Sequence, residues 1–149
     1  NLGHLKGESF SKPGVFPRIK PGENVAFLAA GGLITPALKA ACDLQESTKI
    51  NPAVFNASSA KPLDDAFMQK LTQEFRTLVI FEDHNVLGGT GSAIAEWVGD
   101  FSAQHVRVHR YGVMDTFGES GTPKALYEKH GFVPELIIQN LKLRHILPL

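Results

Sequence analysis

The sequence predicts an α/β fold with a mostly parallel β-sheet and helices on both of its faces. Strand-like apolar runs alternate with helix-like segments four times at short spacing, which is typical of βαβ units. Most of these runs are continuously apolar, as expected of strands that are buried on both faces. The length of 149 residues suits one domain, and no internal repeat or low-complexity segment interrupts it.

The regular elements are expected after a connecting arm. Residues 1–23 are rich in Gly, Pro, Lys and Ser and show little periodicity. Within this arm, VFPRI at 15–19 is a candidate edge strand, because a strand proline is tolerated there. The domain itself is expected to span 24–149, and it begins with the buried-strand run NVAFLAA at 24–30.

Capping signals predict the first two helices. Thr35 precedes a proline, the favoured residue at the first helical position, so we expect Thr35 to be an N-cap. Asp64 is expected to cap a second helix that extends to about Phe75. The first helix is expected to pack through the apolar positions Leu38, Cys42 and Leu44.

Three further strands are expected, at residues 50–56, 77–82 and 105–112. The middle run, TLVIFE, is continuously apolar, as in the interior of a sheet. The last run alternates, so Val106 and Val108 are expected on one face.

Helices are predicted after each of the later strands. The glycine-rich turn GGTGSA at 88–93 opens a helix whose apolar face contains Ile94, Trp97 and Val98. Thr122 precedes a proline and starts a helix that ends near Gly131, and PELIIQNLKLR at 134–144 forms the last helix.

Composition limits the classes of function. Fifteen basic residues balance fifteen acidic residues, so no net field favours nucleic acid or an anionic membrane. A single cysteine, Cys42, excludes an intrachain disulfide and paired Cys-x-x-Cys metal sites, which suits a reducing, cytoplasmic setting. No apolar run approaches the roughly 18 residues of a membrane helix. Because the chain begins with Asn1 and not Met, we expect it to be a piece of a longer protein.

The glycine turn lies where parallel sheets usually bind ligands. It follows a strand and opens a helix, so its N–H groups and the helix dipole favour an anion. However, it lacks the spacing of the dinucleotide fingerprint and the lysine of the phosphate loop. In the alternative interpretation, Gly88 and Gly89 supply positive φ or close approach, and Gly91 lets the helix pack tightly on the sheet.

Titratable residues precede this turn. Glu82, Asp83 and His84 are residue types of acid–base catalysis, but strand neighbours point to opposite faces, so the two carboxylates are not expected to converge. We expect them to cap the turn, to bind backbone amides or to meet another subunit. A catalytic His84 would need a partner and a cleft. His105 and His109 share a strand face, but no third metal ligand is identifiable.

The loop MDTFGESG is a second candidate for contact. Asp115 and Glu119 flank Phe117, and an aromatic residue on such a loop favours an interface. In the alternative interpretation, the loop folds on its own side chains.

Four segments in order resemble the C-terminal domain of the transketolase family over about residues 24–143: AFLAAGGLITPALKAACDL, AKPLDDAF, VIFEDHNVLGGTGSAIAEWV and YGVMDTFGESGTPKALYEKHGF. The FGESG pattern favours the transketolase branch, although the Lys-Pro-Leu-Asp and EDHNVLGG patterns are also similar to deoxyxylulose-phosphate synthase. The resemblance implies a three-layer α/β/α sandwich with a five-stranded mixed sheet, mostly parallel with one antiparallel edge strand.

The resemblance also implies where the chemistry lies. In this family two preceding domains bind thiamine diphosphate at a dimer interface, a divalent metal (Mg²⁺ or Ca²⁺) holds its diphosphate, and the cofactor transfers a two-carbon ketol unit between sugar phosphates. The chain lacks the metal signature of the first domain and the activating glutamate of the second. We therefore expect no cofactor, no metal, no catalytic residue and no activity in this chain alone.

The expected partners are the remaining transketolase domains or subunit, in a homodimer of the parent enzyme, with no nucleic acid or membrane. The alternatives are a deoxyxylulose-phosphate synthase domain, a split subunit, and an independent small-anion binding module that uses the glycine turn. The candidate interface or structural residues are Glu82, His84, Gly88, Gly89, Gly91, Asp115, Phe117 and Glu119.

Overall fold

Five strands form one mixed sheet in the computed structural model, which describes residues 12–59, 61–115 and 120–147. The strand order is β1-β3-β2-β4-β5, and β1 is antiparallel to β3 whereas the other pairs are parallel. The strands are β1 (Arg18–Lys20), β2 (Asn24–Ala29), β3 (Ala53–Asn56), β4 (Phe75–Asn85) and β5 (Arg107–Val113). The predicted α/β class, mixed sheet and antiparallel edge strand are confirmed.

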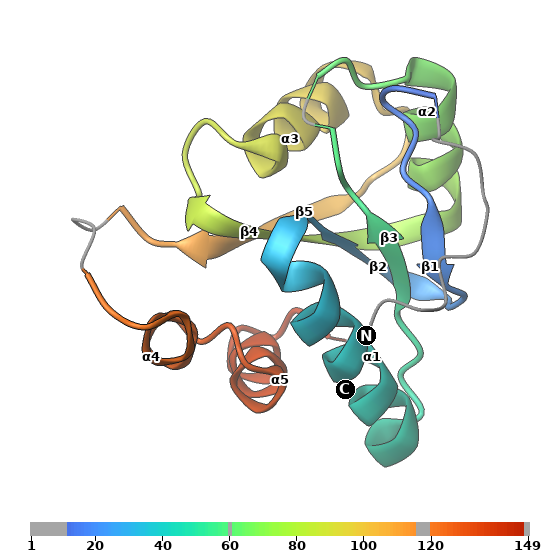
Figure 1. Ribbon diagram of the computed structural model, residues 1–149. Helices are drawn as coiled ribbons and strands as arrows, with labels where there is room; N and C mark the ends of the chain where they lie inside the picture. The colour runs from blue at the N-terminus through green and yellow to red at the C-terminus, as the bar shows by residue number, and fades with distance from the viewer. Residues whose placement is uncertain (1–11, 60, 116–119, 148–149) are drawn as a thin grey trace.

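Helices cover both faces of this sheet and complete the three layers. The helices are α1 (Ile34–Thr48), α2 (Asp65–Glu74), α3 (Thr90–Phe101), α4 (Pro123–Lys129) and α5 (Pro134–Leu143), with a 3-10 turn, η1 (Gly31–Leu33), before α1. α2 and α3 lie on one face, and α1, α4 and α5 lie on the other (Figure 1). No helix within the described ranges is long and apolar enough to cross a lipid bilayer.

Alternation along the central strands divides the core into two clusters. Phe27 and Phe81 point to the α1 and α5 side, where their rings meet edge to face with centroids 5.1 Å apart. Leu28 and Ile80, their neighbours in sequence, pack on the α2 and α3 side. Because both faces are covered, β2 and β4 are apolar without interruption in their interiors.

The prediction that Thr35 caps α1 was wrong. η1 leads directly into the helix, whose first residue is Ile34 and whose N-cap, Leu33, makes no side-chain cap hydrogen bond. Because the 3-10 turn already brings the chain into helical geometry, Thr35 falls inside the first turn. Pro36 also lies there, where a backbone N–H is not required.

The predicted packing stripe of α1 is confirmed at Leu44, which is buried, and at Leu38, which is partly buried and packs against the same core. Leu38 and Cys42 are half-buried. The buried residues of the helix are Ala37, Ala40, Ala41 and Leu44. Small side chains let α1 lie close to the sheet, so alanines occupy the positions nearest to it.

The other two capping predictions are confirmed. The Asp64 carboxylate accepts a hydrogen bond from the Phe67 N–H at 2.8 Å, and the Thr122 hydroxyl accepts one from the Ala125 N–H at 3.3 Å. These contacts satisfy backbone donors that have no partner within the first helical turn.

The edge strand begins at Arg18, further along the chain than the predicted Val15. A turn precedes it, in which the Val15 N–H donates to the Lys12 carbonyl at 3.0 Å. Pro17 has no N–H to donate, but its carbonyl accepts from the Asn56 N–H at 2.9 Å, so pairing with β3 starts there.

A buried tyrosine ties β5 to the connection between α4 and α5. The Tyr111 hydroxyl donates to the Gly131 carbonyl at 2.8 Å and accepts from the Asn140 amide at 2.9 Å. Gly131 adopts a φ of +76°, in the left-handed region that favours glycine. Burial raises the pKa of the Tyr111 hydroxyl, an effect that its hydrogen bond from Asn140 partly offsets.

Tyr111→Phe is expected to lower the free energy of unfolding by about 1–2 kcal/mol, because it leaves the Gly131 carbonyl and the Asn140 amide without their partner. The matched control is Tyr127→Phe, since the Tyr127 hydroxyl is 3.4 Å from Asp83 in a more exposed place, and its loss should change stability by less than about 0.5 kcal/mol. Urea unfolding of both variants at neutral pH measures the difference. Equal losses would contradict the role of Tyr111.

The raised pKa of Tyr111 also predicts a pH dependence. The unfolded chain ionises this tyrosine near its ordinary pKa of 10.0, whereas the folded chain holds the proton to higher pH. The contribution of the protonated Tyr111 hydroxyl to the free energy of unfolding is therefore fully present below pH 10.0. It is lost as the pH rises through the pKa of Tyr111 in the folded chain. Urea unfolding from about pH 8 to about pH 11 should show falling stability, less steeply in Tyr111→Phe. An unchanged slope in that variant would exclude Tyr111 as the source.

Candidate functional site

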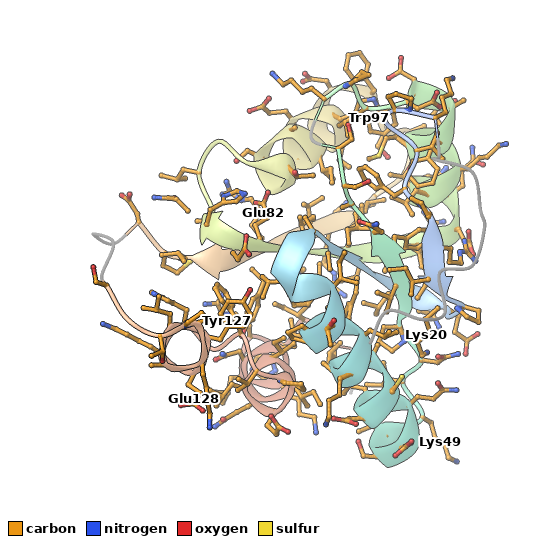
Figure 2. All side chains as sticks on the ribbon, viewed as in Figure 1. Lys20, Lys49, Glu82, Trp97, Tyr127 and Glu128 are labelled. Atoms are coloured by element: carbon orange, nitrogen blue, oxygen red, sulfur yellow. The ribbon has the colours of Figure 1, made fainter. Side chains whose placement is uncertain are left out.

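The carboxyl ends of β2, β4 and β5 meet at one edge of the sheet, which we call the carboxyl edge. η1 follows β2 there, the glycine turn follows β4, and the loop from Met114 follows β5. In Figure 2, Glu82 lies between β4 and α3, and Tyr127 lies on the opposite side of the sheet. Ligands of parallel α/β folds usually bind at this edge.

The side chain of Glu82, a residue of β4, lies at the N-terminus of α3. Its side chain is 1% exposed, and its Oε1 accepts a hydrogen bond from the Gly91 N–H at 3.1 Å. Its Oε2 is also buried, without a hydrogen-bond partner in the described part of the chain. The carboxylate thus lies against the positive end of the helix dipole, in the position that a bound anion would take.

The glycines of the turn have the roles of the alternative interpretation, in which they supply positive φ or a close approach of the backbone. Gly88 adopts a φ of +82°. A Cβ on Gly89 would lie 2.4 Å from Glu82 Oε1 and 2.3 Å from His84 Cε1, and one on Gly91 would lie 3.1 Å from Glu82 Oε2. Gly88 therefore serves the turn through its positive φ, whereas Gly89 and Gly91 let the backbone close over the Glu82 carboxylate.

A hydrogen-bond network that sequence reasoning missed supports the turn. Ser92 Oγ accepts from the Gly88 N–H at 3.0 Å and lies 3.2 Å from the Val86 carbonyl. Arg110 Nη1 donates to both the Val86 carbonyl, at 3.2 Å, and Ser92 Oγ, at 3.1 Å. The sequence predicts no role for Arg110, which shares a strand face with Val108 but finds its acceptors only in the folded chain.

Asp83 lies on the opposite face from Glu82, as predicted. Its carboxylate is 3.4 Å from the Tyr127 hydroxyl of α4, which donates to it. A Cβ on Gly32 would lie 2.1 Å from that hydroxyl oxygen, so the turn after β2 also passes close by. Partial burial and the negative charge of Asp83 raise the pKa of Tyr127.

His84 is half exposed and contacts the turn through both ring nitrogens. Nδ1 lies 2.8 Å from the Asn85 carbonyl, and Nε2 lies 3.6 Å from Glu82 Oε1. The imidazole therefore has a carboxylate neighbour, but that carboxylate is enclosed by the glycine turn. This geometry suits a turn-stabilising contact better than proton transfer to a substrate.

Two large apolar side chains are exposed at the carboxyl edge. Leu87 is 58% exposed and Met114 is 57% exposed. Leu87 follows Val86, and Met114 follows Val113. The Val86 N–H donates to the Val113 carbonyl at 3.0 Å, so both side chains extend from paired backbone segments. A contiguous apolar patch rimmed by polar groups is typical of a contact surface, whereas single exposed apolar side chains are normal.

The predicted loop candidates lie beside these residues or beyond the described ranges. Asp115 has a φ of +24°, and its Oδ1 accepts from the Asn85 amide at 3.1 Å. Phe117 and Glu119 lie outside the described residues.

The described residues of the carboxyl edge do not fit a diphosphate. Glu82 already fills the helix N-terminus with negative charge, which repels a second anion. No group of three or more His, Cys, Asp or Glu side chains within the described ranges has the arrangement of a metal site.

Comparison with known proteins identifies the relatives of this fold. The sequence profile of a family described as "Transketolase, C-terminal domain" matches residues 14–137. The chain belongs to this family. The resemblance noted in the four motifs is thereby confirmed.

Curated and solved members of the transketolase C-terminal domain family are similar to the chain over most of its length. 1-Deoxy-D-xylulose-5-phosphate synthase from Shouchella clausii is 34% identical over 123 residues, covering 83% of this chain and 19% of that protein. The synthase from Nitratidesulfovibrio vulgaris is 35% identical over 132 residues, covering 87% of this chain and 20% of that protein. The chain thus spans about a fifth of these relatives.

A solved structure agrees with the fold. The structure described as "Split gene transketolase, inactive beta4 tetramer" superimposes with a TM-score of 0.78 at 34% identity, over 92% of this chain and 46% of that one.

Gly89→Ala is expected to lower the free energy of unfolding by about 1–3 kcal/mol, because its Cβ would overlap the buried Glu82 carboxylate. The control is Gly99→Ala in α3, where an added Cβ meets nothing within 4 Å. That substitution should stabilise the protein by about 0.5–1 kcal/mol through helix propensity. Urea unfolding compares the two, and a neutral Gly89→Ala would contradict close packing of the turn.

Proposed function

We propose that the chain is the C-terminal, non-catalytic part of a thiamine-diphosphate-dependent enzyme that transfers a two-carbon ketol unit between sugar phosphates, and that it contributes subunit and interdomain contacts. The observation that carries this proposal is the Glu82 carboxylate in the N-terminus of α3. The usual ligand position of the fold is filled from within the chain.

Cofactor and metal belong, in this proposal, to the remaining part of the enzyme. A diphosphate at the glycine turn would face a buried carboxylate, so the turn is a poor anion site and the small-anion binding module is disfavoured there. The family membership and the short coverage of the relatives support further domains or a further subunit that bind thiamine diphosphate and Mg²⁺ or Ca²⁺. The single half-buried Cys42 supports a reducing, cytoplasmic setting.

The carboxyl edge is the proposed contact surface. Leu87 and Met114 supply exposed apolar area, and His84 and Asp115 supply a polar rim, which is the composition expected of such a surface. The proposed partners are the remaining transketolase domains or subunit and a second copy within a homodimer. The tetrameric split-gene transketolase supports assembly of this kind.

Two reactions fit the family, and one observation favours each. The split-gene transketolase, at 34% identity, supports ketol transfer between sugar phosphates. The curated relatives at 34% and 35% identity support deoxyxylulose-phosphate synthesis from pyruvate and glyceraldehyde phosphate. Assaying the complete enzyme with both substrate pairs separates them, because each reaction needs a different donor.

The test of the contact surface is reconstitution of the enzyme from this chain and its remaining part. Activity should appear only on mixing. Leu87→Asp and Met114→Asp should each raise the concentration of chain needed for half-maximal activity at least about tenfold, because a charge would be buried at the contact. Leu143→Asp is the matched control, since Leu143 on α5 is even more exposed than Leu87 and Met114. Activity of the chain alone, or equal effects of all three variants, would contradict the proposal.

A further inference from the structure

A second cluster of polar side chains lies at the opposite edge of the sheet, where β4 and β5 begin. The two strands run side by side in the same direction and start at this edge (Figure 1). Thr77 pairs with Arg107, which brings the start of β4 next to the start of β5. A hollow of about 480 Å³ opens there, and it is lined by Arg76, Gln104, His105 and Arg107. We call it the amino-edge hollow.

The cations of this hollow lack acidic partners. Within the described residues, neither Arg76 nor Arg107 has a carboxylate at ion-pair distance, and nor does His105. By contrast, Arg18 pairs with Glu74 at 2.5 Å. The whole chain has a net charge of zero, so the excess of positive charge is local.

One guanidinium is held in place without being neutralised. Arg76 Nη1 donates to Gln104 Oε1 at 2.8 Å, and the Gln104 N–H donates to Ser102 Oγ at 3.2 Å. The Gln104 amide group keeps its own NH₂ donors for another acceptor. The hollow is therefore lined by two arginines and a glutamine, whose side chains all carry hydrogen-bond donors.

A neighbouring histidine responds to the positive potential. His109 lies two residues after Arg107 on β5, and its Nε2 is buried without a hydrogen-bond partner among the described residues. Burial lowers the pKa of His109, and the charges of Arg107 and Arg144 lower it further. Arg107 and Arg144 thus both contribute positive potential at His109.

Protection of the sheet edge explains only part of this cluster. β5 is an edge strand, and charged side chains on an edge strand prevent pairing with other chains. Arg76 belongs instead to β4, an interior strand, and it is fixed by Gln104 towards the same hollow. Two like charges lining one hollow repel each other unless an anion lies between them.

We propose that the amino-edge hollow binds the phosphate group of a small phosphorylated metabolite. Guanidinium groups match phosphate oxygens in pairs, and Gln104 and His105 add donors at the rim. A stable protein partner would cover about 800 Å² of each surface, far more than four side chains supply. This proposal goes beyond the proposed function, and it does not depend on which of the two proposed reactions the enzyme catalyses.

The first experiment titrates the full chain with inorganic phosphate, ribose 5-phosphate and ribose by isothermal titration calorimetry at low ionic strength. Saturable binding of both phosphorylated probes, with none of ribose, is expected. If ribose 5-phosphate binds more tightly than inorganic phosphate, the phosphate group is recognised as part of a sugar phosphate. If the two affinities are equal, the phosphate group alone is recognised. Binding of ribose to the same extent, or no binding of either phosphate, would overturn the proposal.

Substitutions then locate the bound phosphate. Arg76→Gln and Arg107→Gln should each weaken binding at least about tenfold, since each removes a charge-assisted contact. Both side chains are exposed, so the variants should fold, which circular dichroism and urea unfolding check. The control is Arg18→Gln, which removes the same charge from an ion-paired site. Two results would show non-specific charge attraction and reject the hollow as a site. One is an equal loss of phosphate binding in that control, and the other is binding only of polyglutamate, an anionic polymer without phosphate.

Discussion

The carboxyl edge depends on the burial of the Glu82 carboxylate at the N-terminus of α3. An isolated buried carboxylate is strongly unfavourable, so its position requires the Gly91 N–H and the positive end of the helix dipole. The backbone reaches that carboxylate because a side chain at Gly89 would overlap it and one at Gly91 would crowd it. These two glycines and Glu82 thus form a single unit, in which a glycine-rich turn resembles an anion site but encloses a carboxylate of its own.

The end of β4 also holds the two helical layers to one strand. Glu82 points to α3, whereas Asp83 points to Tyr127 of α4, so consecutive carboxylates contact opposite layers. A pair placed in this way cannot act on one substrate, and only the Glu82 carboxylate is buried. Leu87 and Met114 extend towards solvent next to the backbone hydrogen bond between Val86 and Val113, so the proposed contact surface adjoins paired backbone.

Most of the fold was predictable because its signals are local. Continuous apolar runs located β2 and β4, and the caps Asp64 and Thr122 located two helices. Thr35 misled because the preceding 3-10 turn changes where the helix begins, and that turn has no sequence signature of its own. In the site, opposite faces for Glu82 and Asp83 followed from alternation alone. Arg110 was not predictable, since its acceptors lie 18 and 24 residues away and only tertiary pairing brings them together.

The two edges of the sheet differ in how their charge is balanced, and this difference constrains what each can bind. At the carboxyl edge the helix dipole is matched by a buried acid, so a further anion would meet repulsion and the apolar side chains dominate the outer surface. At the amino edge two guanidinium groups face an open hollow without an acid. Because the chain as a whole is neutral, long-range attraction cannot draw an anion to it, and only this local excess can. Phosphate binding is therefore expected at the edge that parallel folds seldom use, since the usual edge is filled by the protein itself.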